Sequence, residues 1–183
     1  MNTFFISDLH LGHINMIKFR DENGKLNRPN PETGEAFEDV DEMHAMLIKR
    51  WNEKVTPRDR VYVLGDIVFP KEAWSILDEF NGQKIPVLGN HDRHHDEIKG
   101  RFERIYGAID MGSAVCTHIP VHTSQLEYRW QLNIHGHTHH HNLIDHRYLN
   151  VSVEAVDFYP ISADEITDIA TGRGFKDFKL RVR

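Results

Sequence analysis

Short apolar runs alternate with amphipathic segments along the first half of the chain. Apolar runs at residues 3–7, 60–64 and 85–88 predict buried strands. A helical pattern begins at Asp39, and its apolar side chains recur at helical spacing as far as Trp51. This alternation of strands and helices predicts an α/β protein whose first strands are parallel.

Weaker patterns complete the expected elements. Ser162 and Glu165 have capping-box spacing and predict a helix that ends before Gly172. Further helices are expected near residues 15–20, 73–80 and 96–104. Further strands are expected near residues 105–109, 114–118, 131–135 and 148–153, with an edge strand at 175–182. Residues 21–37 are polar and rich in glycine and proline, and a loop of this length is more often functional or mobile than idle.

The composition fits one globular domain that spans residues 1–183. A chain of 183 residues that is 39% hydrophobic buries enough surface to fold without disulfides. The single cysteine, Cys116, and an N-terminus without a signal-peptide pattern predict a cytoplasmic protein with no membrane contact. A net charge of −6 argues against a protein that coats long nucleic acid, but leaves room for a small basic pocket.

Histidine, aspartate and asparagine side chains recur where the predicted strands end. The motifs are Asp8-Leu-His10, Gly65-Asp66, Gly89-Asn-His-Asp92, His118 and Gly136-His-Thr-His139. Ligands gather outside the carboxyl ends of strands in α/β sheets, so these segments can converge on one pocket. Carboxylate, imidazole and amide ligands without thiolate suit Mn²⁺, Fe or Zn²⁺, and the Asp66 carboxylate suits a bridge between two ions.

Five motifs in this order resemble the calcineurin-like metallophosphoesterase family, in its compact prokaryotic and phage type without cap domains. The resemblance implies a β-sandwich flanked by helices, in α-β-β-α layers. It also implies a phosphoric ester hydrolase with two divalent metal ions. Mn²⁺ is the first choice, and the ligand set also accepts Fe, Zn²⁺, Ni²⁺ or Mg²⁺.

The resemblance assigns roles to residues of this chain. It places one metal ion on Asp8, His10, Asp66 and His139. It places the second ion on Asp66, Asn90, His118 and His137, with Asp66 as the bridge. A hydroxide held between the ions is expected to attack phosphorus, and His91 is expected to act as general acid on the leaving oxygen.

Two departures from the family narrow the expected substrate. The segment from Gly65 to Pro70 lacks the downstream Asp-Arg pair of the phosphoprotein phosphatases, and Phe69 stands where related nucleases place a histidine. These departures weaken the protein-phosphatase and nuclease interpretations. The resemblance slightly favours phosphodiester hydrolysis, because compact members without caps often show it, with a nucleotide or a nucleic-acid end among the substrates left open. The alternatives are a nuclease or end-processing phosphatase and a non-catalytic binding scaffold. The nuclease reading needs a basic track, for which the candidates are Arg20, Arg28, Arg93, Arg101 and Arg104.

Several other side chains are candidates for contact with substrate. Arg93, Arg20 and Arg28 could clamp phosphate, because the arginine fork matches phosphate oxygens. His13, three residues after His10, could line the pocket. Cys116 is expected to be a buried hydrophobic residue. Structural roles are expected for His122 and His135, and solvent exposure for His94, His95, His140, His141 and His146. No obligate protein partner is evident.

Overall fold

Strand β1 (Thr3–Ile6) is buried on both faces, because its side chains alternate between two hydrophobic cores. In the computed structural model, which describes residues 1–93 and 95–182, Phe4 and Ile6 pack with the helices. Phe5 packs between two sheets. Its parallel neighbour β2 (Arg60–Leu64) alternates in the same way and is also buried on both faces.

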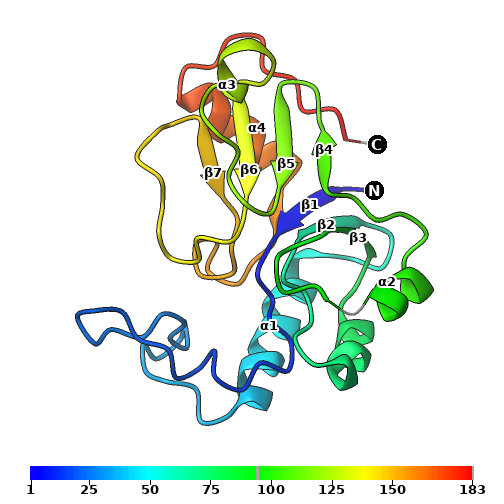
Figure 1. The fold of residues 1–183 in the computed structure, drawn as a ribbon, viewed down its shortest axis with the longest axis vertical. Helices are drawn as coiled ribbons and strands as arrows, with labels where there is room; N and C mark the ends of the chain where they lie inside the picture. The colour runs from blue at the N-terminus through cyan, green and yellow to red at the C-terminus, as the bar shows by residue number, and fades with distance from the viewer. Residues whose placement is uncertain (94, 183) are drawn as a thin grey trace.

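The first sheet has the strand order β3-β2-β1-β8 (Figure 1). β1, β2 and β3 (Gln83–Val87) are parallel, as predicted, and the short β8 (Ile161–Ser162) is antiparallel to β1. Three helical elements cover the outer face of this sheet. They are α1 (Val40–Lys54), the 3₁₀ helix η1 (Lys71–Glu79) and α2 (His95–Arg101). Asp39 caps α1 by accepting a hydrogen bond from the Glu42 N–H.

The second sheet has the order β4-β5-β6-β7 and packs face to face with the first. Its strands are β4 (Ala108–Asp110), β5 (Ala114–Thr117), β6 (Leu132–His135) and β7 (Tyr148–Asn150). The short α3 (Gln125–Tyr128) packs on its outer side, and α4 (Ala163–Gly172) contributes Ile166 to the core between the sheets. The protein is therefore an α/β fold with two mostly parallel sheets flanked by helices.

The two sheets are joined just beyond the end of β1. The Ser7 N–H donates to the Val151 carbonyl at 2.9 Å, and the Val153 N–H donates to the Ser7 carbonyl at 3.0 Å. These bonds place the residues that follow β1 beside the residues that follow β7. This junction decides where the polar strand ends meet.

Two predicted elements are absent from the described chain. Residues 15–20 form turns rather than a helix, because separate short-range bonds such as Met16 N–H to His13 O close them one at a time. The tail at 175–182 makes one isolated bridge, between Leu180 and Gly112, and forms no strand. The capping box at Ser162 is present and opens α4 as predicted. No helix in the described part is long and apolar enough to cross a membrane.

Candidate metal centre

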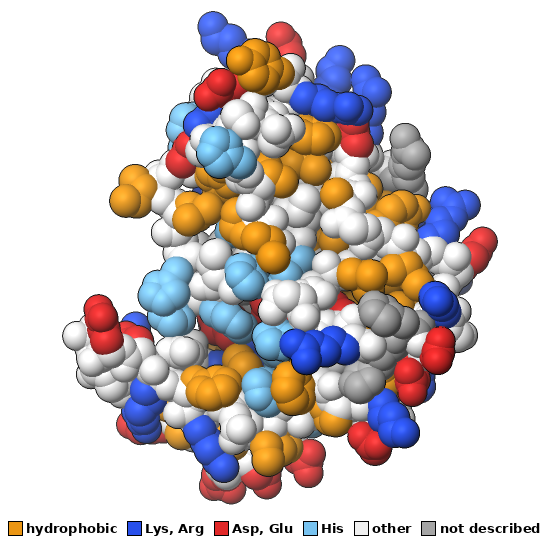
Figure 2. Space-filling view, in the orientation of Figure 1, with side chains coloured by type: hydrophobic (Ala, Val, Ile, Leu, Met, Phe, Trp, Pro, Cys, Tyr) orange, Lys and Arg blue, Asp and Glu red, His pale blue; other side chains and the backbone are white. Residues whose placement is uncertain are grey.

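The ends of four strands direct polar side chains to one place. Asp8 and His10 follow β1, Asp66 follows β2, His118 follows β5 and His139 lies in the segment after β6. β1 and β2 are parallel neighbours, and so are β5, β6 and β7. Ser7 after β1 pairs in parallel with Ser152 after β7, so the carboxyl ends of these strands lie on the same side of the sandwich. Figure 2 shows histidine side chains gathered in a hollow band across this face, with acidic side chains visible between them.

The backbone at this place is held in a conformation that ordinary residues avoid. Eight non-glycine residues in the described chain have a positive φ, and five of them are predicted ligands. The five are Asp8, His10, Asp66, His137 and His139. Each such residue costs on the order of 1–3 kcal/mol, and strain of this kind persists mainly at functional sites.

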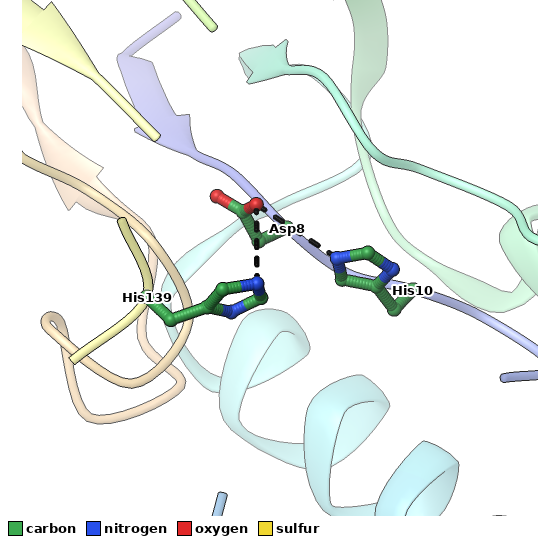
Figure 3. A group of neighbouring side chains, drawn as sticks. All are labelled: Asp8, His10 and His139. Atoms are coloured by element: carbon green, nitrogen blue, oxygen red, sulfur yellow. Dashed lines mark ion pairs between the residues drawn. The ribbon is translucent and has the colours of Figure 1, made fainter. Parts of the chain in front are cut away.

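One group of side chains converges around Asp8. In Figure 3, Asp8 and His10 project from the chain after β1, His139 projects from the segment after β6, and all three point toward one another. The Asp8 Oδ1 atom lies 3.8 Å from His10 Nε2 and 3.9 Å from His139 Nε2. Two atoms bound to one ion at 2.0–2.2 Å are at most about 4.4 Å apart, so these separations suit a shared cation.

The buried atoms of this group lack hydrogen-bond partners. Asp8 Oδ1 and both ring nitrogens of His10 are buried and have no such partner among the described residues. An unpaired buried polar atom costs about 1–3 kcal/mol, so the group is costly as it stands. Burial, together with the charge of Arg28, lowers the pKa of His10 to about 2, so the ring is neutral and one of its nitrogens offers a lone pair to a cation. These residues therefore fit a divalent metal ion.

A second group converges around His118. Its Nδ1 lies 2.8 Å from the Leu64 carbonyl, which can only accept, so Nδ1 carries a proton. Its Nε2 lies 2.9 Å from Asn90 Oδ1 and 3.3 Å from Asp66 Oδ2. Two oxygen acceptors thus face one ring nitrogen, and a proton or a metal ion must lie among them. Burial lowers the pKa of His118, but Asp66 and Asp8 outweigh it and hold that pKa above its usual value.

Asp66 lies between the two groups. Its Oδ2 is 3.6 Å from His10 Nε2 as well as 3.3 Å from His118 Nε2. Its Oδ1 accepts a hydrogen bond from the His91 N–H at 2.9 Å. Burial raises the pKa of Asp66, but His118 and the His91 N–H outweigh burial and hold it near 2, so the carboxylate is charged. This position is the one a bridging ligand requires.

His137 and His91 border the same place. The His137 N–H donates to Asp8 Oδ2 at 2.8 Å, and its exposed ring lies 5.1 Å from the ring of His118. The half-buried ring of His91 lies 5.7 Å from the ring of His10. Asn90 reaches the second group through its Oδ1. All eight residues assigned to catalysis or metal binding from the sequence are thus brought together.

Two glycines are required by close approach between strand ends. A Cβ at Gly89 would collide with the carboxylate of Asp66, and a Cβ at Gly136 would collide with Ser7 and with the carboxylate of Asp8. Neither glycine has a positive φ, so turn geometry is not the reason they are needed. The glycines let the carboxylates sit directly against neighbouring backbone.

Asp92 organises the site, a role the sequence reasoning missed. Its carboxylate accepts hydrogen bonds from the N–H groups of Asp66, Ile67 and Gly89, at 2.8, 2.9 and 2.8 Å. It therefore ties the turn after β2 to the turn after β3 and holds Asp66 in place. Its position as the last residue of the Gly-Asn-His-Asp motif was the available signal.

The candidate phosphate clamps have different environments. Arg28 is fully buried, donates to the carbonyls of Asp8 and Leu9, and pairs with Glu154, so it does not reach a substrate. Its expected role as a clamp does not fit the structure. Arg20 is exposed and donates to Gly24 within its own loop. Arg93 is exposed and follows Asp92, and its role as a clamp stays a prediction.

Aromatic rings line one side of the site. The ring of His13 stacks on Phe69 with centroids 4.0 Å apart, and it meets the edge of Phe19 at 5.7 Å. Phe69 and Phe19 are 41% and 44% exposed. His13 is 5.6 Å from His10 and Phe69 is 5.9 Å from His91, so this wall borders the candidate ligands.

Most of the remaining histidines that were singled out have the burial expected of them. His135 is buried and bonds to the Gly136 carbonyl, whereas His122 is exposed and bonds to Ser124. His141 and His146 are exposed, but His140 is half-buried. His94 and the side chain of His95 lie outside the described residues.

The single thiol of the chain provides a test of the fold. Cys116 lies on β5, is 0% exposed, and burial raises the pKa of its thiol. We expect the native protein to resist alkylation by a maleimide at neutral pH and the denatured protein to react fully, since the thiolate is the reactive form. Mass spectrometry before and after denaturation measures this. Rapid labelling of the native chain would contradict the packing described here.

Comparison with known proteins places the chain among uncharacterized relatives. No protein-family model matches it. It is 31% identical over 177 residues to the uncharacterized protein MJ1445 of Methanocaldococcus jannaschii, covering 91% of this chain and 89% of that protein.

Two solved structures are similar to this chain. The crystal structure of a protein of unknown function, AQ665 from Aquifex aeolicus, matches with a TM-score of 0.67 and 24% identity over 92% of this chain and 98% of that one. This match shows a shared fold. A structure described as a novel archaeal phosphodiesterase matches with a TM-score of 0.47 and 19% identity, over 83% of this chain and 82% of that one.

Proposed function

The chain belongs to the family of the uncharacterized Methanocaldococcus jannaschii protein, and we propose that it is a metal-dependent phosphoesterase that favours phosphodiesters. One observation carries the proposal. Buried or half-buried carboxylate oxygens and imidazole nitrogens from four strand ends face one another at 3.3–3.9 Å, and several lack hydrogen-bond partners within the described chain. The order of the motifs along the sequence supports the same reading.

Two cations, with Mn²⁺ as the first choice, would be held by the residues already described. Asp8, His10, Asp66 and His139 form one set, and Asp66, Asn90, His118 and His137 form the other. When bound, the ions would activate water near neutral pH and neutralise phosphoryl charge. The chain's own residues would then bind the substrate and protonate its leaving group. His91 holds a proton for the leaving oxygen, and Arg93 contacts the phosphoryl oxygens.

The aromatic wall favours a particular kind of ester. Phe69, Phe19 and His13 offer apolar contact beside His91. A phosphodiester with a flat or apolar group would gain contact area there, whereas inorganic phosphate would not.

The nuclease alternative receives less support from the arginines it requires. Arg28 is buried, and Arg101 donates to Asp78 at 2.6 Å, so neither extends a basic track beside the site.

Hydrolysis of two model esters tests the proposed function. With Mn²⁺ we expect release of p-nitrophenol from bis-p-nitrophenyl phosphate, with slower release from p-nitrophenyl phosphate. Treatment with EDTA should abolish turnover, and added Mn²⁺ should restore it. A protein that leaves both esters intact with Mn²⁺ bound would contradict the proposal, and turnover of the monoester alone would redirect it to phosphomonoesters.

A further inference from the structure

A buried arginine connects the long polar loop to the candidate metal centre. Arg28 belongs to the loop at residues 21–37, yet its side chain is 0% exposed. Its Nη2 donates to the Asp8 carbonyl at 2.6 Å and its Nη1 donates to the Leu9 carbonyl at 3.0 Å. The guanidinium therefore holds the backbone from which two candidate ligands, Asp8 and His10, project.

The same arginine is paired with a buried glutamate that touches a third candidate ligand. Arg28 Nε lies 2.6 Å from Glu154 Oε1, and the same oxygen lies 3.2 Å from His139 Nδ1. The Glu154 side chain is only 4% exposed. A carboxylate paired with a guanidinium can only accept, so the His139 Nδ1–H must donate to it. The other ring nitrogen, Nε2, is left with its lone pair directed toward Asp8 Oδ1 at 3.9 Å.

Burying the Arg28–Glu154 ion pair costs free energy, which indicates that the pair has a function. Burying a guanidinium and a carboxylate carries a desolvation cost that their attraction offsets only when the remaining donors are satisfied. Here the Arg28 donors are satisfied by Glu154 Oε1 and by the backbone of one ligand segment, and Glu154 Oε1 also faces the ring of another ligand, whereas Glu154 Oε2 has no hydrogen-bond partner among the described residues. The pair also adds no net charge beside a site for cations.

We propose that Arg28 and Glu154 are positioning residues for the metal centre. Glu154 fixes the tautomer and orientation of the His139 ring, and Arg28 fixes both Glu154 and the carbonyls of Asp8 and Leu9. Through Arg28, the loop at residues 21–37 therefore fixes the position of the first group of ligands. This inference rests on the proposed metal centre, but its key contact can be tested without metal.

Metal affinity of two Glu154 variants is the first measurement. Glu154→Met removes the acceptor, so we expect Mn²⁺ to bind 10–100-fold more weakly by calorimetry, the usual cost of losing such a support. Glu154→Gln keeps an acceptor oxygen for His139 and should lose less. Arg50→Met is the matched control, because Arg50 is also buried but pairs with Asp157. It should lower the melting temperature and leave Mn²⁺ affinity unchanged.

The protonated nitrogen of His139 is the second measurement, made by ¹⁵N NMR on metal-free protein at a pH where the ring is neutral. We expect the proton on Nδ1 in the wild type and a shift toward Nε2 in Glu154→Met. A wild-type ring protonated on Nε2, or equal loss of affinity in folded Glu154→Met and Arg50→Met, would overturn the inference. A wild type that binds no divalent ion would instead refute the proposed function, while the ring measurement would still decide the role of Glu154.

Discussion

Replacing Asp66 with asparagine is expected to reduce Mn²⁺-dependent hydrolysis by more than about 100-fold. Loss of residues that merely support a ligand already costs 10–100-fold, and Asp66 lies in both groups of candidate ligands. Its Oδ2 is 3.6 Å from His10 Nε2 and 3.3 Å from His118 Nε2, so removal of its charge weakens both groups at once. Steady-state hydrolysis of bis-p-nitrophenyl phosphate and calorimetric titration with Mn²⁺ measure the two effects.

The control for Asp66→Asn is a carboxylate at the opposite end of the same strand. Asp59 precedes β2, is 4% exposed, and accepts hydrogen bonds from the N–H groups of Asn2 and Thr56. Asp59→Asn should lower stability and leave turnover per folded molecule unchanged. An Asp66→Asn protein that keeps its metal and turns over within a few-fold of the wild type would exclude Asp66 as the shared ligand.

The elements that the sequence predicts best are those with one strong local cause. Helix α1 has a capping aspartate and a continuous apolar stripe, and its start agrees with the structure. The strand β2 is an apolar run that follows Arg60, and its bounds agree at both ends. The turns at 15–20 contain Met16 and Ile17, which are buried like residues of a helix, but no continuous ladder forms there. Apolar spacing alone therefore does not distinguish a helix from successive turns.

Some residues of the site could be predicted from the sequence and others could not. Side chains that meet at the strand ends were identifiable because each stands in a short motif beside a predicted strand. Glu154 carries no such signal, since a single glutamate after a strand is ordinary. Its importance arises from the junction between Ser7 and Val151, which joins parts of the chain far apart in sequence. Arg28 was singled out, but its direction is set by the fold of its loop, which spacing does not reveal.

Replacing His91 with alanine is expected to lower kcat by 10²–10⁴-fold, the usual contribution of a general acid, while Mn²⁺ affinity stays near that of the wild type. The ring of His91 lies beside His10 rather than among the converging ligand atoms, so its removal leaves those atoms in place. Its backbone N–H would still donate to Asp66 Oδ1. Catalysis and metal binding should therefore separate in this variant.

The leaving group determines how large the loss should be. p-Nitrophenolate leaves readily without a proton, whereas an alkoxide needs one, so His91→Ala should slow an alkyl diester more than bis-p-nitrophenyl phosphate. His122→Ala is the control, because His122 is exposed and bonds only to Ser124 among its described partners. Equal losses for both esters would assign His91 to charge stabilisation on the phosphoryl group. Unchanged turnover of both would remove it from the reaction altogether.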